Sequence, residues 1–141
     1  MYGRMQAAMT LFLFLVTALP LSVGAQGPSK AECASVGLKS CKPLDDFVFS
    51  LRNAVKAEDK DTVAAMVAYP IEIQVKDGLE IKDKAAFVRN YDLVLTKSVR
   101  DAIAQEPFVH PRKIIQFVGN QAQIWLGVEK GRLKIDTIII E

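Results

Sequence analysis

Residues 121–141 read QAQIWLGVEKGRLKIDTIIIE, and this stretch decides the fold class. Apolar side chains alternate with polar ones from Ala122 to Val128, and the alternation returns at Leu133 after a Glu-Lys-Gly-Arg turn. Successive side chains of a strand point to opposite faces of a sheet, so the pattern predicts two antiparallel strands joined by a short turn. One face of these strands is expected to pack on helices and the other to meet solvent.

Three large apolar residues interrupt the expected polar face. By period two, Trp125, Ile138 and Ile140 point the same way as the glutamines and charged residues of the two strands. An apolar patch that contains a tryptophan is seldom left bare on a monomer. The pattern therefore predicts a homodimer with Trp125 near the centre of its interface. Two alternatives remain open: the N-terminal segment covers Trp125, or a bulge in the strand turns it inward.

The first 25 residues have the layout of a secretory signal peptide. Arg4 precedes an apolar stretch from Ala7 to Leu19, and the small-residue ending SVGA follows. The apolar stretch has about thirteen residues, whereas roughly twenty are needed to span a bilayer. Cleavage is predicted after Ala25, which would give a periplasmic or secreted protein with no stable membrane anchor.

The two cysteines of the chain, Cys33 and Cys41, lie close together in the stretch ECASVGLKSC. Export would place them in an oxidising compartment, where two thiols more often pair than stay free. We therefore predict a disulfide that pins an N-terminal segment, residues 26–43. No metal site is predicted, because the single histidine, His110, is distant in sequence and alone.

Residues 44–141 are predicted to form a single domain. Its helices are predicted from apolar periodicity and from residues that can cap a helix N-terminus. They are residues 44–57, a helix that begins at Asp59 or Asp61, a helix capped by Asp83 and a helix capped by Thr96. A hairpin with an Asp-Gly turn is predicted over residues 71–81, and three strands are predicted from Lys113 onward. This order predicts an α+β fold with an antiparallel sheet.

The charge and the motifs of the chain exclude several function classes. There are 18 Lys and Arg residues against 16 Asp and Glu residues, with a formal net charge of +2, and the basic residues are scattered. A nucleic-acid partner is therefore not expected. The sequence has no glycine-rich phosphate loop, nucleophile elbow or metal-binding helix motif, so no cofactor is expected.

The segments AAMVAYPIEIQV, IKDKAAFVRNYDLVLTKSVRDAI and GNQAQIWLGV resemble small exported bacterial proteins of the nuclear transport factor 2-like superfamily. With the last strand, the resemblance spans Leu44 to Glu141. It implies a cone-shaped α+β fold, in which a strongly curved antiparallel sheet packs on the N-terminal and middle helices and leaves a pocket at the open end. It does not imply catalysis, because this fold hosts enzymes, binding modules and dimerisation domains.

An apolar pocket is expected from side chains on the helix-facing side of the sheet and on the helices that close it. These are Met66, Tyr69, Phe87, Tyr91, Ile124, Leu126, Ile135 and Thr137. The alternative is that the same side chains fill the cone, since protein interiors pack to crystal-like density. Asp136 is interpreted as a surface charge, because charged residues are rarely buried without a partner.

Enzymes of the resembled superfamily work with an acid or base inside the pocket, and the strand residues expected to face the helices do not titrate. We therefore predict an exported, non-enzymatic binding or interaction domain that takes a small apolar ligand or a protein partner. The alternatives are a small-substrate enzyme of the isomerase or hydrolase type on the same fold, and an immunity or inhibitor protein against a secreted toxin or a wall-cleaving enzyme.

Overall fold

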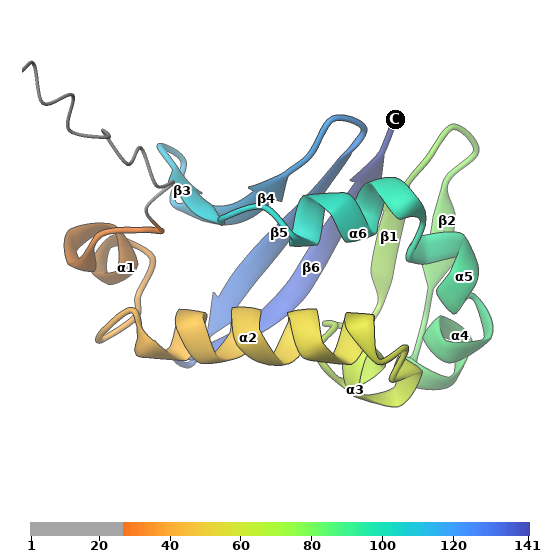
Figure 1. Ribbon diagram of the computed structural model, residues 1–141, viewed down its shortest axis with the longest axis horizontal. Coiled ribbons are helices and arrows are strands. Elements are labelled where there is room, and N and C mark those ends of the chain that lie inside the picture. The colour runs from red at the N-terminus through yellow and green to blue at the C-terminus, as the bar shows by residue number, and fades with distance from the viewer. Residues whose placement is uncertain (1–26) are drawn as a thin grey trace, which may run out of the picture.

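The computed structural model describes residues 27–141 (Figure 1). Its helices are α1 (Lys30–Ser35), α2 (Lys42–Lys56), α3 (Lys60–Ala65), α4 (Lys84–Arg89), α5 (Tyr91–Val94) and α6 (Lys97–Ile103). Its strands are β1 (Ile71–Gln74), β2 (Leu79–Ile81), β3 (Phe108–His110), β4 (Ile114–Val118), β5 (Ala122–Glu129) and β6 (Arg132–Ile140). The predicted signal peptide and its cleavage site lie outside the described residues.

Three helices, α3, α4 and α6, begin at caps that the sequence predicts. The side chain of Asp59 accepts a hydrogen bond from the Thr62 backbone N–H, and Asp83 and Thr96 cap α4 and α6 in the same way. Each cap satisfies one of the backbone donors that a helix leaves free in its first turn. The expected third helix is instead two short ones, since α4 and α5 are separated at Asn90.

The six strands form one sheet in the order β2-β1-β6-β5-β4-β3. The predicted hairpin over residues 71–81 and the three C-terminal strands are present. Two features differ from the expectation. The pairing of β1 with β6 is parallel, and β3 adds an edge strand between Pro107 and Pro111, where no strand was predicted. The α+β fold is confirmed.

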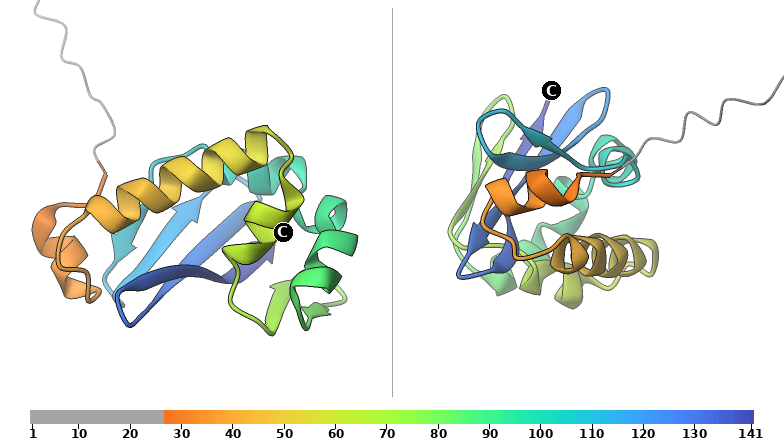
Figure 2. Two further views of the ribbon diagram at one scale, coloured as in Figure 1. Left: turned by 90° about the horizontal axis from the view of Figure 1, so that it is seen from below. Right: turned by 90° about the vertical axis from the view of Figure 1, so that its left-hand side faces the viewer.

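All the helices that pack on the sheet cover one of its faces, which we call the inner face (Figure 2). Helix α2 runs across this face, with α1 beyond one end and α4 and α5 beyond the other (Figure 1). Helix α6 packs very closely on the turn between β4 and β5: a Cβ atom added at Gly119 would lie 3.0 Å from the Cβ of Ala102. Within residues 27–141, no helix has the length and apolar content needed to cross a bilayer.

Arg52 of α2 ties that helix to the end of α6. Its Nε donates to the Ile103 carbonyl oxygen at 3.0 Å, and its Nη2 donates to the Gln105 carbonyl oxygen at 2.7 Å. These carbonyls belong to the last turn of α6 and its continuation, which carry the partial negative charge of a helix C-terminus. The guanidinium group therefore both satisfies free acceptors and fixes the distance between two helices of the inner layer.

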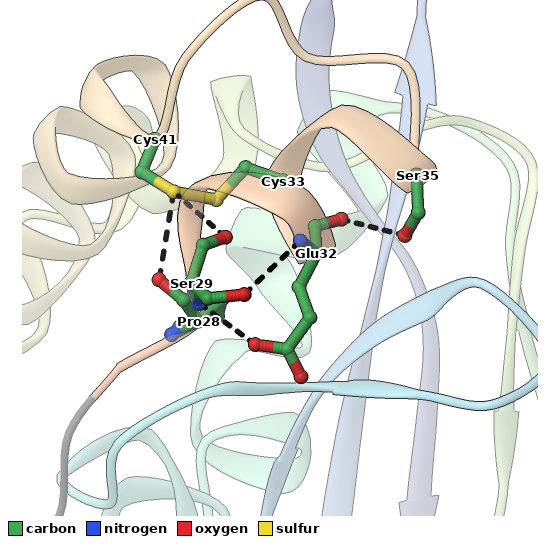
Figure 3. The surroundings of a disulfide bond; sticks show 6 residues. All are labelled: Pro28, Ser29, Glu32, Cys33, Ser35 and Cys41. Atoms are coloured by element: carbon green, nitrogen blue, oxygen red, sulfur yellow. Dashed lines mark hydrogen bonds between the residues drawn. A yellow bond between two sulfur atoms is a disulfide. The ribbon is translucent and has the colours of Figure 1, made fainter.

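The predicted disulfide between Cys33 and Cys41 is present, with a Cα–Cα distance of 5.4 Å (Figure 3). It joins α1 to the residue that precedes α2. Helix α1 itself was not predicted. It begins with a capping box in which the Glu32 carboxylate accepts from the Ser29 N–H at 2.7 Å and the Ser29 hydroxyl oxygen accepts from the Glu32 N–H at 3.2 Å. The Ser29 backbone N–H and, to a smaller extent, the Ser29 side chain interact with the carboxylate and hold the pKa of Glu32 below its usual value.

Candidate functional site

Most of the residues expected to line an apolar pocket are packed in the hydrophobic core. Phe87 and Tyr91 have an exposed fraction of 0%, and Ile124, Leu126 and Ile135 have at most 3%. The Phe87 ring also packs edge-on against Tyr91, at 6.3 Å between ring centroids. A side chain that a water molecule cannot reach cannot line an open cavity. At these positions the side chains fill the cone, as the alternative interpretation of the sequence expects.

The two tyrosines named as polar pocket residues have different surroundings. The Tyr69 hydroxyl donates to the Ala64 carbonyl oxygen at 2.6 Å, near the end of α3, and desolvation raises its pKa to about 12. The Tyr91 hydroxyl is buried and has no hydrogen-bond partner among the described residues. Desolvation raises the pKa of Tyr91 as well. Tyr69 thus serves the structure of α3, whereas Tyr91 leaves a polar atom unsatisfied in the core.

Cations lie over the ring of Tyr91. The Lys60 Nζ is 5.2 Å from the ring centroid, and the guanidinium carbon of Arg100 is 5.9 Å from it. Arg100 is held in place by its Nε, which donates to the Leu95 carbonyl oxygen at 2.9 Å. The negative face of an aromatic ring attracts cations at such distances. Tyr91 therefore anchors three helices through its ring, and this role does not need its hydroxyl group.

A β-bulge in β6 corrects the predicted faces of three residues. Trp125 pairs with Thr137, and Leu126 pairs with Ile135, so Asp136 is an extra residue between two paired positions. The bulge reverses the parity of every later residue of the strand. Ile138 therefore points inward, where it is 2% exposed, and Ile140 packs against the core from the same face. Thr137 faces outward, so it does not line the inner face as predicted.

Trp125 stays on the outer face, the face that carries no helices. Lys134 and the bulged Asp136 also lie on this face, beside a continuous set of uncharged residues across β3, β4, β5 and β6 that we call the outer-face patch. Its members are Phe108, Gln116, Val118, Gln123, Trp125, Thr137 and Ile139. The register places Phe108, Gln116, Trp125 and Thr137 in one row across the sheet, and Val118, Gln123 and Ile139 in the next row.

The outer-face patch combines apolar groups with amides. Phe108 and Val118 are exposed at 42% and 39%, whereas Gln116, between Phe108 and Trp125, is only 6% exposed. The Trp125 Nε1 donates to the Gln123 side-chain oxygen at 3.2 Å, which orients the indole along the sheet. No member of the patch carries a formal charge.

Sequence reasoning missed five members of this patch, of which Thr137 and Ile139 were expected on the inner face because the bulge was not foreseen. Gln116 and Val118 lie in the stretch KIIQFV, where the two-residue period opposite Ile115 and Phe117 would have placed them on the outer face. Phe108 had no such signal, because its segment between Pro107 and Pro111 reads as a connection.

A small pocket lies beside the bulge, at one end of the patch. Its volume is about 230 Å³, and its lining includes Trp125, Gly127, Asp136 and Thr137, with Val36 from the N-terminal segment. Asp136 is exposed, but partial desolvation raises its pKa above the ordinary value, and the neighbouring Thr137 hydroxyl lowers it in part. We call this site the bulge pocket.

Other polar residues show no constellation typical of a metal centre. Within residues 27–141, no group of three or more His, Cys, Asp or Glu side chains is placed to hold a metal ion. The ring of His110 takes part in the turn after β3, where its Nδ1 accepts from the Arg112 backbone N–H at 3.1 Å.

Comparison with known proteins bears on the fold. A solved structure of a ketosteroid isomerase candidate from Shewanella frigidimarina is 11% identical, with a TM-score of 0.44, over 71% of this chain and 95% of that one. A designed nuclear transport factor 2-like protein is 13% identical, with a TM-score of 0.41, over 70% of this chain and 96% of that one. No family model and no curated protein matches the chain.

The helices-hairpin-helices-strands order and the curved sheet with helices on one face agree with the α+β fold class that the sequence resemblance implies. Identities of 11% and 13% and TM-scores below 0.5 are too low for either likeness to carry an argument about activity.

Proposed function

We propose that this chain is an exported interaction domain that pairs with a second copy through the outer-face patch. The patch is the observation that carries the proposal. It holds the single tryptophan of the chain and two well-exposed apolar side chains, Phe108 and Val118. A set of this kind, rimmed by polar groups, is typical of a protein interface.

A second copy is favoured over another partner by the chemistry of the patch. Because its members carry no charge, two identical patches do not repel each other. The side-chain amide of Gln123, which is partly exposed, offers both donors and an acceptor, so it can pair with its own copy across a two-fold axis. A patch that is neutral and carries amides is therefore complementary to itself.

Export is the second half of the proposal. The signal-like layout of residues 1–25 suggests it, and the Cys33–Cys41 disulfide is compatible with an oxidising compartment. The intact mass of the protein from the exported fraction is expected to correspond to a chain that begins at Gln26. A soluble exported species that retains residues 1–25 would contradict the proposed cleavage.

Sedimentation velocity tests the pairing. The purified protein is expected to sediment as a dimer, and Trp125→Ala and Val118→Lys are each expected to shift it to a folded monomer. Leu93→Lys is the matched control, because Leu93 lies on α5, away from the patch, and is 66% exposed. A wild-type protein that remains monomeric well above micromolar concentration would rule the dimer out.

A further inference from the structure

The bulge pocket contains a carboxylate that lacks a cationic partner. Asp136 makes no ion pair with any residue in the described part of the chain, although ion pairs join five other acidic residues there to lysines and arginines. Two lysines lie near Asp136: Lys134 is two residues away in the chain, and Lys113 lines the same pocket. Lys134 donates its Nζ to the Ala65 carbonyl oxygen at 2.6 Å, and Lys113 lines the pocket without forming an ion pair with Asp136.

The fold brings this carboxylate to a defined place. Gly127 lies on the neighbouring strand, and a Cβ atom added there would lie 2.7 Å from the Asp136 Oδ2. Real Cβ atoms do not approach other atoms so closely, so the carboxylate occupies space that only a glycine leaves free. The bulge turns Asp136 out of the strand pairing, and Gly127 gives its side chain room to lie across β5.

Trp125 provides the second recognition element. It lines the same pocket and is the single tryptophan of the chain. The face of an indole attracts a cation through its quadrupole, and tryptophan is the best of the aromatic side chains in this respect. A carboxylate and an indole that line one small pocket therefore favour the same kind of ligand, which is a cation with an apolar stem.

We propose that the bulge pocket binds an alkylammonium group, with Asp136 as its counter-ion and Trp125 as its aromatic wall. The volume of about 230 Å³ is below the range typical of pockets for drug-sized ligands, so it suits a group the size of one side chain. A compact ammonium on a flexible apolar stem is the chemistry shared by small free amines and by the lysine side chain. This site differs from the proposed dimer contact, although Trp125 and Thr137 belong to both.

Trp125 fluorescence gives a direct test, because no other tryptophan contributes to the signal. The purified protein is titrated with n-butylammonium chloride, with sodium chloride at equal ionic strength and with 1-butanol as the uncharged isostere. A saturable change is expected with butylammonium alone. Equal changes with butanol, or no saturable change with butylammonium and with the lysine derivative described below, would overturn the proposal.

A second ligand distinguishes a site for small free amines from a site for the lysine side chain of another protein. Nα-acetyl-lysine amide presents the same group on a peptide-like backbone. Similar affinity for this compound and for butylammonium supports a site for free amines. Clearly tighter binding of the lysine derivative supports a site for a lysine side chain of another protein.

Two substitutions test the role of the carboxylate in different ways. Asp136→Asn removes the charge and is expected to weaken butylammonium binding about tenfold or more. Gly127→Ala keeps the charge but displaces the carboxylate, and it is expected to weaken binding to a similar extent while the protein remains folded. Asp77→Asn, at an exposed aspartate in the β1–β2 turn, is the matched control and should bind as the wild type does. Unchanged binding in both Asp136→Asn and Gly127→Ala would overturn the assignment.

The pH dependence of binding adds a readout that does not rely on substitution. Binding requires the ionised carboxylate, whose pKa is raised above the ordinary value of 3.8. Affinity should therefore decline, as the pH falls, at a higher pH than an ordinary aspartate would give. Lys113 is the other charged residue in the pocket lining. Affinity that stays constant through the titration of Asp136 would contradict its role.

Measurement at low protein concentration keeps the result independent of self-association, so failure of this proposal and failure of the dimer can be told apart.

Discussion

The two faces of the sheet are made from similar residues, yet they serve different ends. On the inner face, Ile124, Ile135 and Ile138 are at most 2% exposed and hold the helices by excluding water. On the outer face, Trp125 and Ile139 lie in the same two strands and are only partly buried. The difference shows that residue type does not decide the role of a side chain in this sheet. In β6, the position of a residue before or after the bulge at Asp136 decides which face its side chain occupies.

The most direct test of the difference between the two faces is to truncate neighbouring isoleucines of β6 that lie on opposite faces. Ile138→Ala should lower the free energy of unfolding by about 3 kcal/mol, because it opens a cavity in the core. Ile139→Ala should lower it by less than about 1 kcal/mol, because that side chain is already partly in solvent. Urea denaturation measures both. The reverse order would mean that β6 runs without a bulge, with the parity that the sequence alone suggests.

Removing the disulfide tests whether the N-terminal segment stabilises the layer of helices on the inner face. Cys33 is fully buried, and the bond closes a loop of about nine residues, for which the chain-entropy estimate is roughly 2.6 kcal/mol. The double variant Cys33→Ala, Cys41→Ala should lose about this much stability and keep its far-UV circular dichroism. Wild-type protein that has been reduced and alkylated provides a comparison without mutation. A loss of the native spectrum would mean that α1 is required for the fold itself.

Removing the hydroxyl group should change the free energy of unfolding in opposite directions at Tyr69 and Tyr91. Tyr69→Phe removes the hydrogen bond to Ala64 and should cost about 1 kcal/mol. Tyr91→Phe removes a buried hydroxyl without a partner, so it should be neutral or stabilising by up to about 1 kcal/mol. Thermal and urea unfolding of the two variants measure the difference. A clear loss in Tyr91→Phe would show that the hydroxyl has a partner, such as a bound water, in solution.

Tyr69 also predicts an alkaline effect. Its pKa of about 12 in the folded protein lies above the ordinary value of 10. The unfolded chain therefore loses this proton first, and stability should decline as the pH rises from 10 through 12. In Tyr69→Phe this part of the decline should be missing.

The smallest expected effect concerns Asp136. Because desolvation raises its pKa, the protonated form is favoured on folding, and the corresponding stability is present below pH 3.8 and lost as the pH rises through the folded value. Asp136→Asn should therefore be slightly more stable than the wild type at pH 7, and this gain should vanish near pH 3. Equal differences at both pH values would mean that the carboxyl group titrates normally.

The sequence predicted those features that depend on local chemistry. Asp59, Asp83 and Thr96 cap the helices as expected, because a cap needs only a side-chain acceptor beside the first turn. The hairpin over residues 71–81 followed from its Asp-Gly turn, and the disulfide followed from the expected compartment and the spacing of its cysteines.

The sequence did not predict the features that depend on pairing between distant strands. A bulge leaves no mark in the residues themselves, so period-two counting is reliable as far as Asp136 and wrong from Thr137 onward. The error moved Thr137 to the wrong face and, with it, Ile138 and Ile140. The expected pocket failed for a related reason: periodicity tells which side chains face inward, but not whether they leave space between them.

The place of β6 in the sheet has a consequence for the order of assembly during synthesis. Strand β6 follows every other strand in the chain, yet it lies between β1 on one side and β5 on the other. The β1–β2 hairpin therefore cannot join the rest of the sheet until residues 132–140 have been made. Contacts between such distant segments slow folding, because the intervening chain must be closed into a loop first. A nascent chain of this topology cannot complete its sheet until late in its synthesis, and this property would suit the export that we propose.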